Sequence, residues 1–253
     1  MIGPKVPGLR ERILVFGREG SGKSYSWLTI ARLHRQKGSG ARFYVIDTDD
    51  AIPRMLAEEF EDVADIVTVY PAFRWPQYES AIASILQEAK PGDWLVVDMI
   101  DRAWSSVQEH FSSEVYGQDF GSFLLEVRKE ARNPREAWTA IAREQMWQIV
   151  SRLYREWEDR VIFESPTHVY ATASVSVVDK DTPDEVKRLF PGGIMPAGHR
   201  KLGHAFHTVL LAYRHGSEYR MDTIKDRGRK PLEAEIVTSF ALGYLIKVAG
   251  WRV

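Results

Sequence analysis

Residues 17–24 carry the clearest chemical signal in the chain. The segment Gly17-Arg18-Glu19-Gly20-Ser21-Gly22-Lys23-Ser24 matches the pattern G-x-x-x-x-G-K-[ST] in full, between an apolar run and a helical pattern. Glycines let such a backbone curl so that successive N–H groups point at phosphate oxygens, and the following helix directs its positive end at the same anion. The pattern predicts a nucleoside-triphosphate site made by Gly17, Gly20, Ser21, Gly22, Lys23, Ser24 and Tyr25.

Within this site, two side chains have distinct expected tasks. Lys23 is expected to reach the β- and γ-phosphates, and the Ser24 hydroxyl to ligate Mg²⁺. A second magnesium contact is expected from Asp98, because it ends the apolar run Leu95-Val96-Val97 and so lies at the carboxyl end of a buried strand. Asp101 is the alternative, three residues further along and in the following helix.

Hydrolysis also needs a group that orients the attacking water. Met99 follows Asp98, so a glutamate directly after the metal-binding aspartate is not available. The acidic turn Asp47-Thr48-Asp49-Asp50 follows the apolar run at 43–46, the first one after the phosphate loop. In a parallel sheet this turn lies at the same edge as the phosphate loop. Asp49 is therefore the expected water-orienting residue, with Asp50 as the alternative.

The elements that must position these residues alternate along the first half of the chain. Short apolar runs predict buried strands, and periodic patterns between them predict helices. The strands are expected at 13–16, 43–46, 66–70 and 94–98, and the helices at 23–36, 53–60 and 77–90. This order favours parallel pairing with right-handed crossovers, and hence an α/β fold with helices flanking a mainly parallel sheet.

The rest of the chain divides into a helical part and a strand-rich part. Residues 102–164 are expected to be a helical insertion, clearest over 136–157, whose tryptophan stripe is typical of packing. Strands are expected at 168–172, 208–213 and 219–224, the last two forming a hairpin through Gly216-Ser217, with a loop at 190–196. No linker divides the chain, so a single domain over residues 1–253 is expected.

Composition limits the class of protein. The 253 residues are 44% hydrophobic and carry 34 basic and 35 acidic side chains, a net charge of −1, which excludes a disordered chain and a uniformly basic one. There is no cysteine, so disulfides and thiolate metal sites are excluded. The longest apolar runs are far shorter than the roughly 20 residues that cross a bilayer. We expect no membrane partner and a cytoplasmic location.

Three of these features together resemble a known family. The phosphate loop, the V-I-D-T-D turn and the L-V-V-D run without a following Glu look like the RecA-type ATPase core, over residues 11–101 and 168–230. More narrowly, they resemble small phage-encoded proteins that are minimal RecA-like ATPases, several linked to single-strand annealing and recombination. The family usually has Glu where this chain has Asp49, which bears on hydrolysis rate more than on nucleotide binding.

The resemblance implies further roles. In RecA-like filaments a basic pair reaches the γ-phosphate of a neighbouring subunit, and Lys225 and Arg227 match its spacing, within a run that continues to Lys230. A solvated loop or a DNA-phosphate contact are the alternatives for this run. Thr172 and Ser174 are weaker candidates for sensing the γ-phosphate.

Two other clusters are expected to be structural. His199, His204 and His207 lie close in sequence without a nearby acidic ligand, which does not favour a zinc site. The basic residues of the helical part are expected to be an exposed helix face, with a DNA groove as the alternative; they are Arg128, Lys129, Arg132 and Arg135.

Taken together, the sequence predicts an ATP- and Mg²⁺-dependent RecA-like P-loop ATPase. The resemblance adds single-stranded DNA as partner, a homo-oligomer (ring or filament) as the working state, and the host bacterial cytoplasm as location if the protein is phage-encoded. Three alternatives stay open: a DNA-packaging or helicase-type motor, a nucleotide-dependent scaffold with little turnover, and a small-molecule kinase.

Overall fold

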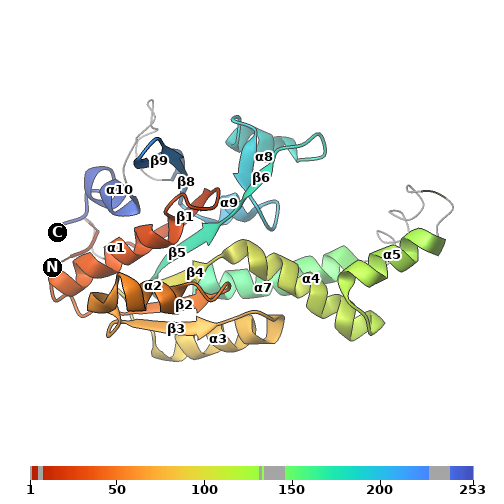
Figure 1. The fold of residues 1–253 in the computed structure, drawn as a ribbon, viewed down its shortest axis with the longest axis horizontal. Helices are drawn as coiled ribbons and strands as arrows, with labels where there is room; N and C mark the ends of the chain where they lie inside the picture. Colours follow the sequence, from red (N-terminus) through yellow and green to blue (C-terminus); the bar gives the residue numbers. More distant parts are fainter. Residues whose placement is uncertain (1, 5–7, 131–132, 134–145, 228–239, 253) are drawn as a thin grey trace.

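The computed structural model describes residues 2–4, 8–130, 133, 146–227 and 240–252. Seven strands form one sheet in the order β3-β2-β4-β5-β1-β8-β9 (Figure 1). All neighbours are parallel except β8 and β9, which pair antiparallel. The strand bounds are β1 (Arg12–Gly17), β2 (Phe43–Asp47), β3 (Val67–Pro71), β4 (Trp94–Asp98), β5 (His168–Ala173), β8 (Thr208–His215) and β9 (Glu218–Asp226).

The central strands are parallel because helices cover both faces of the sheet. Every residue of β2, β4 and β5 is buried, as expected for strands whose two faces both lie in apolar layers. One layer contains α1 (Lys23–Gln36), α2 (Ile52–Glu58), the short η1 (Glu61–Val63) and α10 (Ala241–Lys247). The other contains α3 (Trp75–Glu88), α4 (Ile100–Tyr116) and α7 (Met146–Asp159). The expected α/β sheet with flanking helices is confirmed.

The described residues between β4 and β5 form helices alone, as the sequence predicts. They are α4, α5 (Phe120–Glu130), α7 and the π-helical turn η2 (Arg160–Glu164). Part of this region is a layer of the core rather than an addition to it, because Tyr154 and Trp157 of α7 are buried and the Trp157 indole donates to Tyr78 O at 3.2 Å. The far end of α4 and α5 extend away from the sheet as an arm (Figure 1).

The segment between β5 and β8 is more ordered than expected. Ile194–Pro196, expected to lie in a loop, forms β7 and pairs antiparallel with β6 (Val175–Val177); α8 (Asp184–Leu189) lies in the connection between these strands, and α9 (Leu202–Ala205) follows β7. The predicted loop is present over 190–193 but was wrong for 194–196, because a three-residue strand carries little periodicity. Phe190 anchors the segment with its ring 5.6 Å from that of Phe16.

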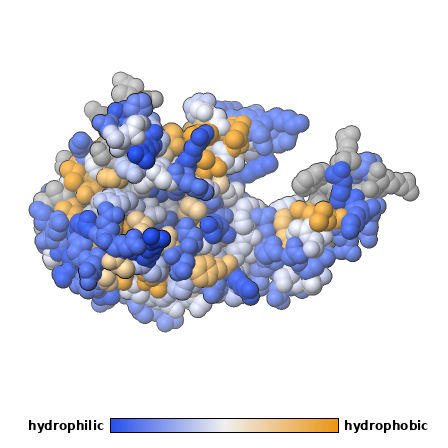
Figure 2. Space-filling model, viewed as in Figure 1, coloured by the Kyte–Doolittle hydropathy of each residue, from blue (hydrophilic) through white to orange (hydrophobic). Residues whose placement is uncertain are grey.

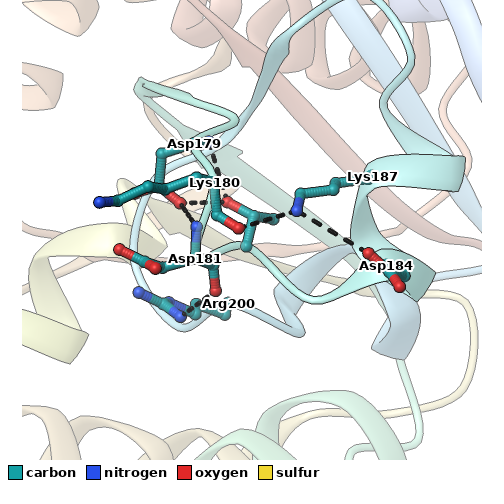
Figure 3. Close-up of polar contacts among 7 residues, drawn as sticks. Asp179, Lys180, Asp181, Asp184, Lys187 and Arg200 are labelled. Carbon is teal, nitrogen blue, oxygen red and sulfur yellow. Dashed lines mark hydrogen bonds and ion pairs between the residues drawn. The ribbon is translucent and has the colours of Figure 1, made fainter.

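A polar turn connects β6 to α8 (Figure 3). The Asp179 carboxylate accepts hydrogen bonds from Asp181 N–H at 3.0 Å and from the Thr182 hydroxyl at 2.8 Å. Arg200 and Lys187 donate to backbone carbonyls of the same turn, both at 2.9 Å. Local side-chain bonds of this kind fix a turn without an apolar core.

The predicted hairpin near the C-terminus is present. β8 and β9 are joined by Gly216 and Ser217, and Gly216 has the positive φ of 61° that a tight two-residue turn needs. No helix among the described residues is long and apolar enough to cross a bilayer.

Candidate functional site

The glycine-rich segment forms a tight turn between β1 and α1. β1 ends at Gly17 and α1 begins at Lys23, so the motif occupies the position that the sequence predicts for it. Gly20 and Gly22 have φ of 69° and 83°, a left-handed region that other residues enter at a cost. The curl of the backbone therefore depends on glycine at these two positions.

Gly17 is required for a different reason, close approach. A Cβ on Gly17 would lie 2.3 Å from Ala212 O and 2.6 Å from Ser21 Oγ, so no larger residue fits. Ser21 is buried, and its hydroxyl has no hydrogen-bond partner in the described part of the chain. A buried hydroxyl without a partner is costly, so the loop contains a polar group suited to an incoming oxygen ligand.

Lys23 is folded back over this loop. Its ammonium donates to Gly17 O at 2.9 Å and to Arg18 O at 3.0 Å, and only 8% of the residue is exposed. Burial lowers the pKa of Lys23, since removal from water disfavours the charged form. Two backbone carbonyls are weak partners for a full positive charge, so a more negative ligand in the loop would compete for this ammonium.

Four carboxylates are near enough to influence the same ammonium. The charges of Asp98, Asp101, Glu19 and Asp49 each raise the pKa of Lys23 and partly oppose the effect of burial. They come from the phosphate loop, from the ends of β2 and β4 and from the start of α4. The fold therefore brings the predicted lysine and both predicted aspartates to one place.

Asp98 is held by two hydrogen-bond donors. It is 2% exposed and accepts from Trp27 Nε1 at 3.0 Å and from the Thr172 hydroxyl. Burial raises its pKa, and its polar neighbours Thr172, Trp27 and Ser24 lower it. Ser24 and Asp98, the two residues predicted to share Mg²⁺, are thus near enough for the Ser24 side chain to affect the Asp98 pKa.

The acidic turn after β2 divides into a structural and an exposed part. Asp47 lies beside Asp98 in the sheet register, is fully buried, and accepts N–H groups of Asp49 and Ile52, both at 3.3 Å. Burial raises the pKa of Asp47 to about 6. Asp49 and Asp50 are exposed, and Asp50 has a φ of 60°. Asp47 therefore shapes the turn, and Asp49 or Asp50 is left to meet solvent.

The hydroxyls considered as phosphate sensors both bind carboxylates. Thr172 donates to Asp98, while Ser174 donates both its hydroxyl and its N–H to Asp101. Asp101 lies in the first turn of α4, as expected, and its carboxylate ties that helix to the end of β5. These bonds link the ends of β4 and β5 and the start of α4 into one polar cluster.

Lys225 and Arg227 lie apart from this cluster within the chain. The Lys225 ammonium donates to the carbonyls of Gly203, His204 and Phe206 at 2.7, 3.2 and 2.6 Å. Burial, with the nearby charge of Arg227, lowers the pKa of Lys225 to about 8. Arg227 is exposed.

The register of the hairpin explains this separation. Asp226 is opposite Thr208, which is level with Ile13 near the start of β1, whereas the phosphate loop follows the end of β1. The pair is therefore at the other end of the strands from its own loop. The rest of the basic run, 228–230, lies outside the described residues, as do Arg132 and Arg135.

Several residues around the site were not expected from the sequence. Trp27 binds Asp98 although 71 positions separate them, and the 37%-exposed Tyr219 lies beside Gly22, where a Cβ would be 3.1 Å from its ring. Tyr25, predicted to bind the ligand, instead packs its ring on Phe240 at 5.4 Å and Phe60 at 4.9 Å, which leaves only its backbone for the loop. Nothing in the local sequence signals these long-range contacts.

The histidines have structural surroundings. The centroid of the His199 ring lies 5.1 Å from that of Trp104 and 5.4 Å from that of Tyr154, while His204 lies in α9 and His207 two residues beyond its end. Among the described residues there is no group of three or more His, Cys, Asp or Glu side chains able to hold a metal. The magnesium site expected at Ser24 and Asp98 has one hydroxyl and one carboxylate from the protein, so it does not count as such a group.

Comparison of the chain with protein-family models and with curated proteins finds no match. The chemistry of the site is accordingly inferred from its own residues and their geometry.

Proposed function

We propose that this chain is a Mg²⁺-dependent ATPase with a RecA-like P-loop core. The observation that carries the proposal is the geometry at the end of β1: a curled glycine loop whose Ser21 hydroxyl has no partner among the described residues, and a buried lysine bonded only to backbone carbonyls. Those groups fit a bound triphosphate, because phosphate oxygens would accept a hydrogen bond from the hydroxyl and pair with the positive charge of the ammonium. The mainly parallel sheet, with β1, β4 and β2 ending on one edge, supports the RecA-like layout.

Each residue of the loop has a defined contribution to binding. The backbone N–H groups of residues 17–25 and the start of α1 would face the phosphate oxygens, and Ser21 would donate its hydroxyl to one of them. Ser24 and Asp98 would hold Mg²⁺, which supplies positive charge against the phosphate oxygens. Lys23 would exchange two backbone carbonyls for phosphate oxygens, a stronger, charge-assisted pairing.

Hydrolysis requires a base beside the terminal phosphate. Asp49 is exposed and close enough to Lys23 for its charge to raise the lysine pKa, so it would orient a water molecule and accept its proton. Asp50 is the alternative. Asp47 is not a candidate, because both carboxylate oxygens accept backbone N–H groups.

Three parts of the proposal rest on the RecA resemblance alone. They are single-stranded DNA as partner, a homo-oligomer as working state, and action of Lys225 and Arg227 on a neighbour's nucleotide. Because these two residues lie at the other end of the strands from their own loop, any nucleotide that they contact would belong to another subunit. A solvated loop and a DNA-phosphate contact remain the alternatives for this pair. A motor ATPase and a nucleotide-dependent scaffold remain the alternative functions.

The proposal is tested by titrating the protein with ATP and Mg²⁺ in a calorimeter and measuring phosphate release in parallel. Lys23→Ala should weaken binding by about 100-fold, the effect of losing a charge-assisted contact of roughly 3 kcal/mol. Lys37→Ala, an exposed lysine just beyond α1, is the matched control and should leave binding unchanged. Thermal unfolding of both variants checks that the loop has folded.

The outcomes separate the functions. Equal affinity in Lys23→Ala and wild type would refute the proposed site. Asp49→Asn should abolish phosphate release while binding persists, whereas a wild type that binds ATP without releasing phosphate would favour the scaffold.

A further inference from the structure

A cavity lies on the α3–α4 face of the sheet, at the same edge as the phosphate loop. It has a volume of about 770 Å³, within the usual range for a small-molecule site, and is lined from Thr48 and the start of α3 along α4 to the start of α5. This cavity is not predictable from sequence patterns, because its walls come from four separate segments.

The inner end of this cavity is positively charged. Arg102 donates to Thr48 O at 3.3 Å, and Arg74 lies at the start of α3. Neither arginine forms an ion pair with a carboxylate within the described ranges. Ser105 and Ser106, one turn along α4 from Arg102, add hydroxyl donors. Arginine with hydroxyls is a combination suited to phosphate.

The acidic residues of the cavity lie at its other end, and two of them already accept hydrogen bonds from backbone N–H groups. Asp119 accepts Ser122 N–H at 2.9 Å and Glu109 accepts Phe120 N–H at 3.3 Å, so both carboxylates cap the start of α5. Glu114 remains, at the outer end beside His110. The cavity is thus polarised along α4, cationic near the sheet and acidic near the arm.

An exposed aromatic ring lies beside the cationic end. Phe73 is 50% exposed although it is a large apolar side chain, and it lines the cavity next to Arg74. An exposed ring beside arginine is the arrangement on which nucleobases stack. Carboxylates at the opposite end can accept hydrogen bonds from amino and hydroxyl groups of a base or sugar.

We propose that the α3–α4 cavity binds one nucleoside monophosphate unit, with its phosphate at Arg74 and Arg102 and its base against Phe73. The unit comes either from a free mononucleotide or from a single strand of nucleic acid. Binding at this cavity does not depend on the proposed ATPase function. If the unit belongs to a strand, the cavity is the place where the nucleic-acid partner of the proposed ATPase binds.

The cavity is also connected to the candidate ATPase residues. Thr48 lines it, its N–H donates to Asp98 O at 2.8 Å, and its hydroxyl accepts Met99 N–H at 2.7 Å. Thr48 is followed directly by Asp49. A phosphate that draws Arg102 away from Thr48 O would therefore act on the peptide that positions Asp49 and Asp98.

The test uses the full-length Lys23→Ala chain, so that the phosphate loop does not add to the signal and the proposed ATPase site is not itself being tested. Binding of dTMP and of an oligothymidylate of about 12 nucleotides is measured by fluorescence titration at low salt. Arg74→Glu is expected to weaken binding at least about tenfold. Arg35→Glu, an exposed arginine in the last turn of α1 outside the cavity, is the matched charge control and should change it less than about twofold.

The probes distinguish the sources. Binding of dTMP that Arg74→Glu weakens supports a mononucleotide site, and binding of the oligonucleotide alone with the same sensitivity supports a strand. Phe73→Ala, which removes only the exposed ring, should weaken either one. No binding of either probe, or binding that Arg74→Glu and Arg35→Glu weaken equally, overturns the proposal.

Discussion

At the scale of single residues, the Asp98 carboxylate shows how much of a site lies outside its motif. The motif places Ser24 near this carboxylate, whereas the two hydrogen-bond donors are Trp27, one turn along α1, and Thr172 of β5. Packing alone does not explain why the Trp27 indole N–H points at a buried carboxylate. Trp27 therefore fixes the orientation of Asp98 and favours its ionised form.

The change Trp27→Phe tests this role. It keeps the ring in the core and removes one hydrogen bond to a charged group, worth roughly 1.5–3 kcal/mol, so Mg²⁺ in the nucleotide complex should bind about tenfold more weakly. Because that bond lowers the Asp98 pKa, its loss should move the acid limit of Mg²⁺-dependent binding to higher pH. Binding at several pH values measures both effects.

Trp94→Phe is the control for this prediction. Trp94 is equally buried and its indole donates to His34 Nε2 at 3.2 Å, at the other end of β4. It should lose stability without a change in Mg²⁺ affinity. If both variants shift Mg²⁺ binding alike, Trp27 acts only through packing.

Prediction from sequence succeeds at this scale where the chemistry is local. Gly17 to Ser24 are consecutive, so their pattern alone indicated the loop. Asp98 was recognisable because it ends an apolar run. The partners of Asp98 were not, since Thr172 is 74 positions away and only the strand order places it alongside.

At the scale of elements, α7 combines an expected face with an unexpected group. Its aromatic stripe packs inward as the spacing indicated, with Val150, Tyr154 and Trp157 buried. Glu158 is also buried, at 7% exposure, and one carboxylate oxygen has no partner in the described part of the structure. Burial raises the pKa of Glu158 to about 8.

This carboxyl predicts a pH dependence of stability. A raised folded-state pKa means that the folded chain holds its proton where the unfolded chain, with a pKa of 4.5, has lost it. Wild type should therefore lose roughly 2–3 kcal/mol of unfolding free energy relative to Glu158→Gln as pH rises from about 5 to about 7. Urea unfolding at both pH values measures the difference.

The exposed Glu156, on the same helix, provides the comparison. Glu156→Gln removes the same charge at the surface, where its pair with Arg152 is worth under about 1 kcal/mol, so it should give no such pH-dependent gap. Parallel pH profiles of wild type and Glu158→Gln would show that the carboxyl is solvated in the folded chain.

The elements that the sequence missed share a physical cause. β6 and β7 are three residues each, α9 is four, and α8 is six, so none contains enough repeats for a period to emerge. The central strands were predictable because burial on both faces makes them continuous apolar runs. The β-turn of the hairpin was predictable from Gly216 and Ser217.

At the scale of the whole molecule, the candidate functional residues lie together at one edge of the sheet. The phosphate loop, the acidic turn and the start of α4 all lie at the carboxyl ends of parallel strands, the usual place for ligands in such sheets. Two projections extend beyond the core, the β6–α8 region and the α4–α5 arm. The surface is hollowed between them (Figure 2).

The sequence indicated the class of this fold but not its strand order. Alternating patterns predict parallel pairing, yet β5 entering between β4 and β1 is decided by packing of distant segments. For the same reason the α3–α4 cavity was not foreseeable, since its walls join residues near 48, 74 and 102–119.

The most direct measurement is a crystal structure of the chain with Mg²⁺ and a non-hydrolysable ATP analogue. We expect the triphosphate to lie within the curl of residues 17–24, with the Lys23 ammonium moved from Gly17 O and Arg18 O onto phosphate oxygens and with Mg²⁺ held by Ser24 and Asp98. An analogue bound elsewhere, while Lys23 stays on those two carbonyls, would refute the proposed site.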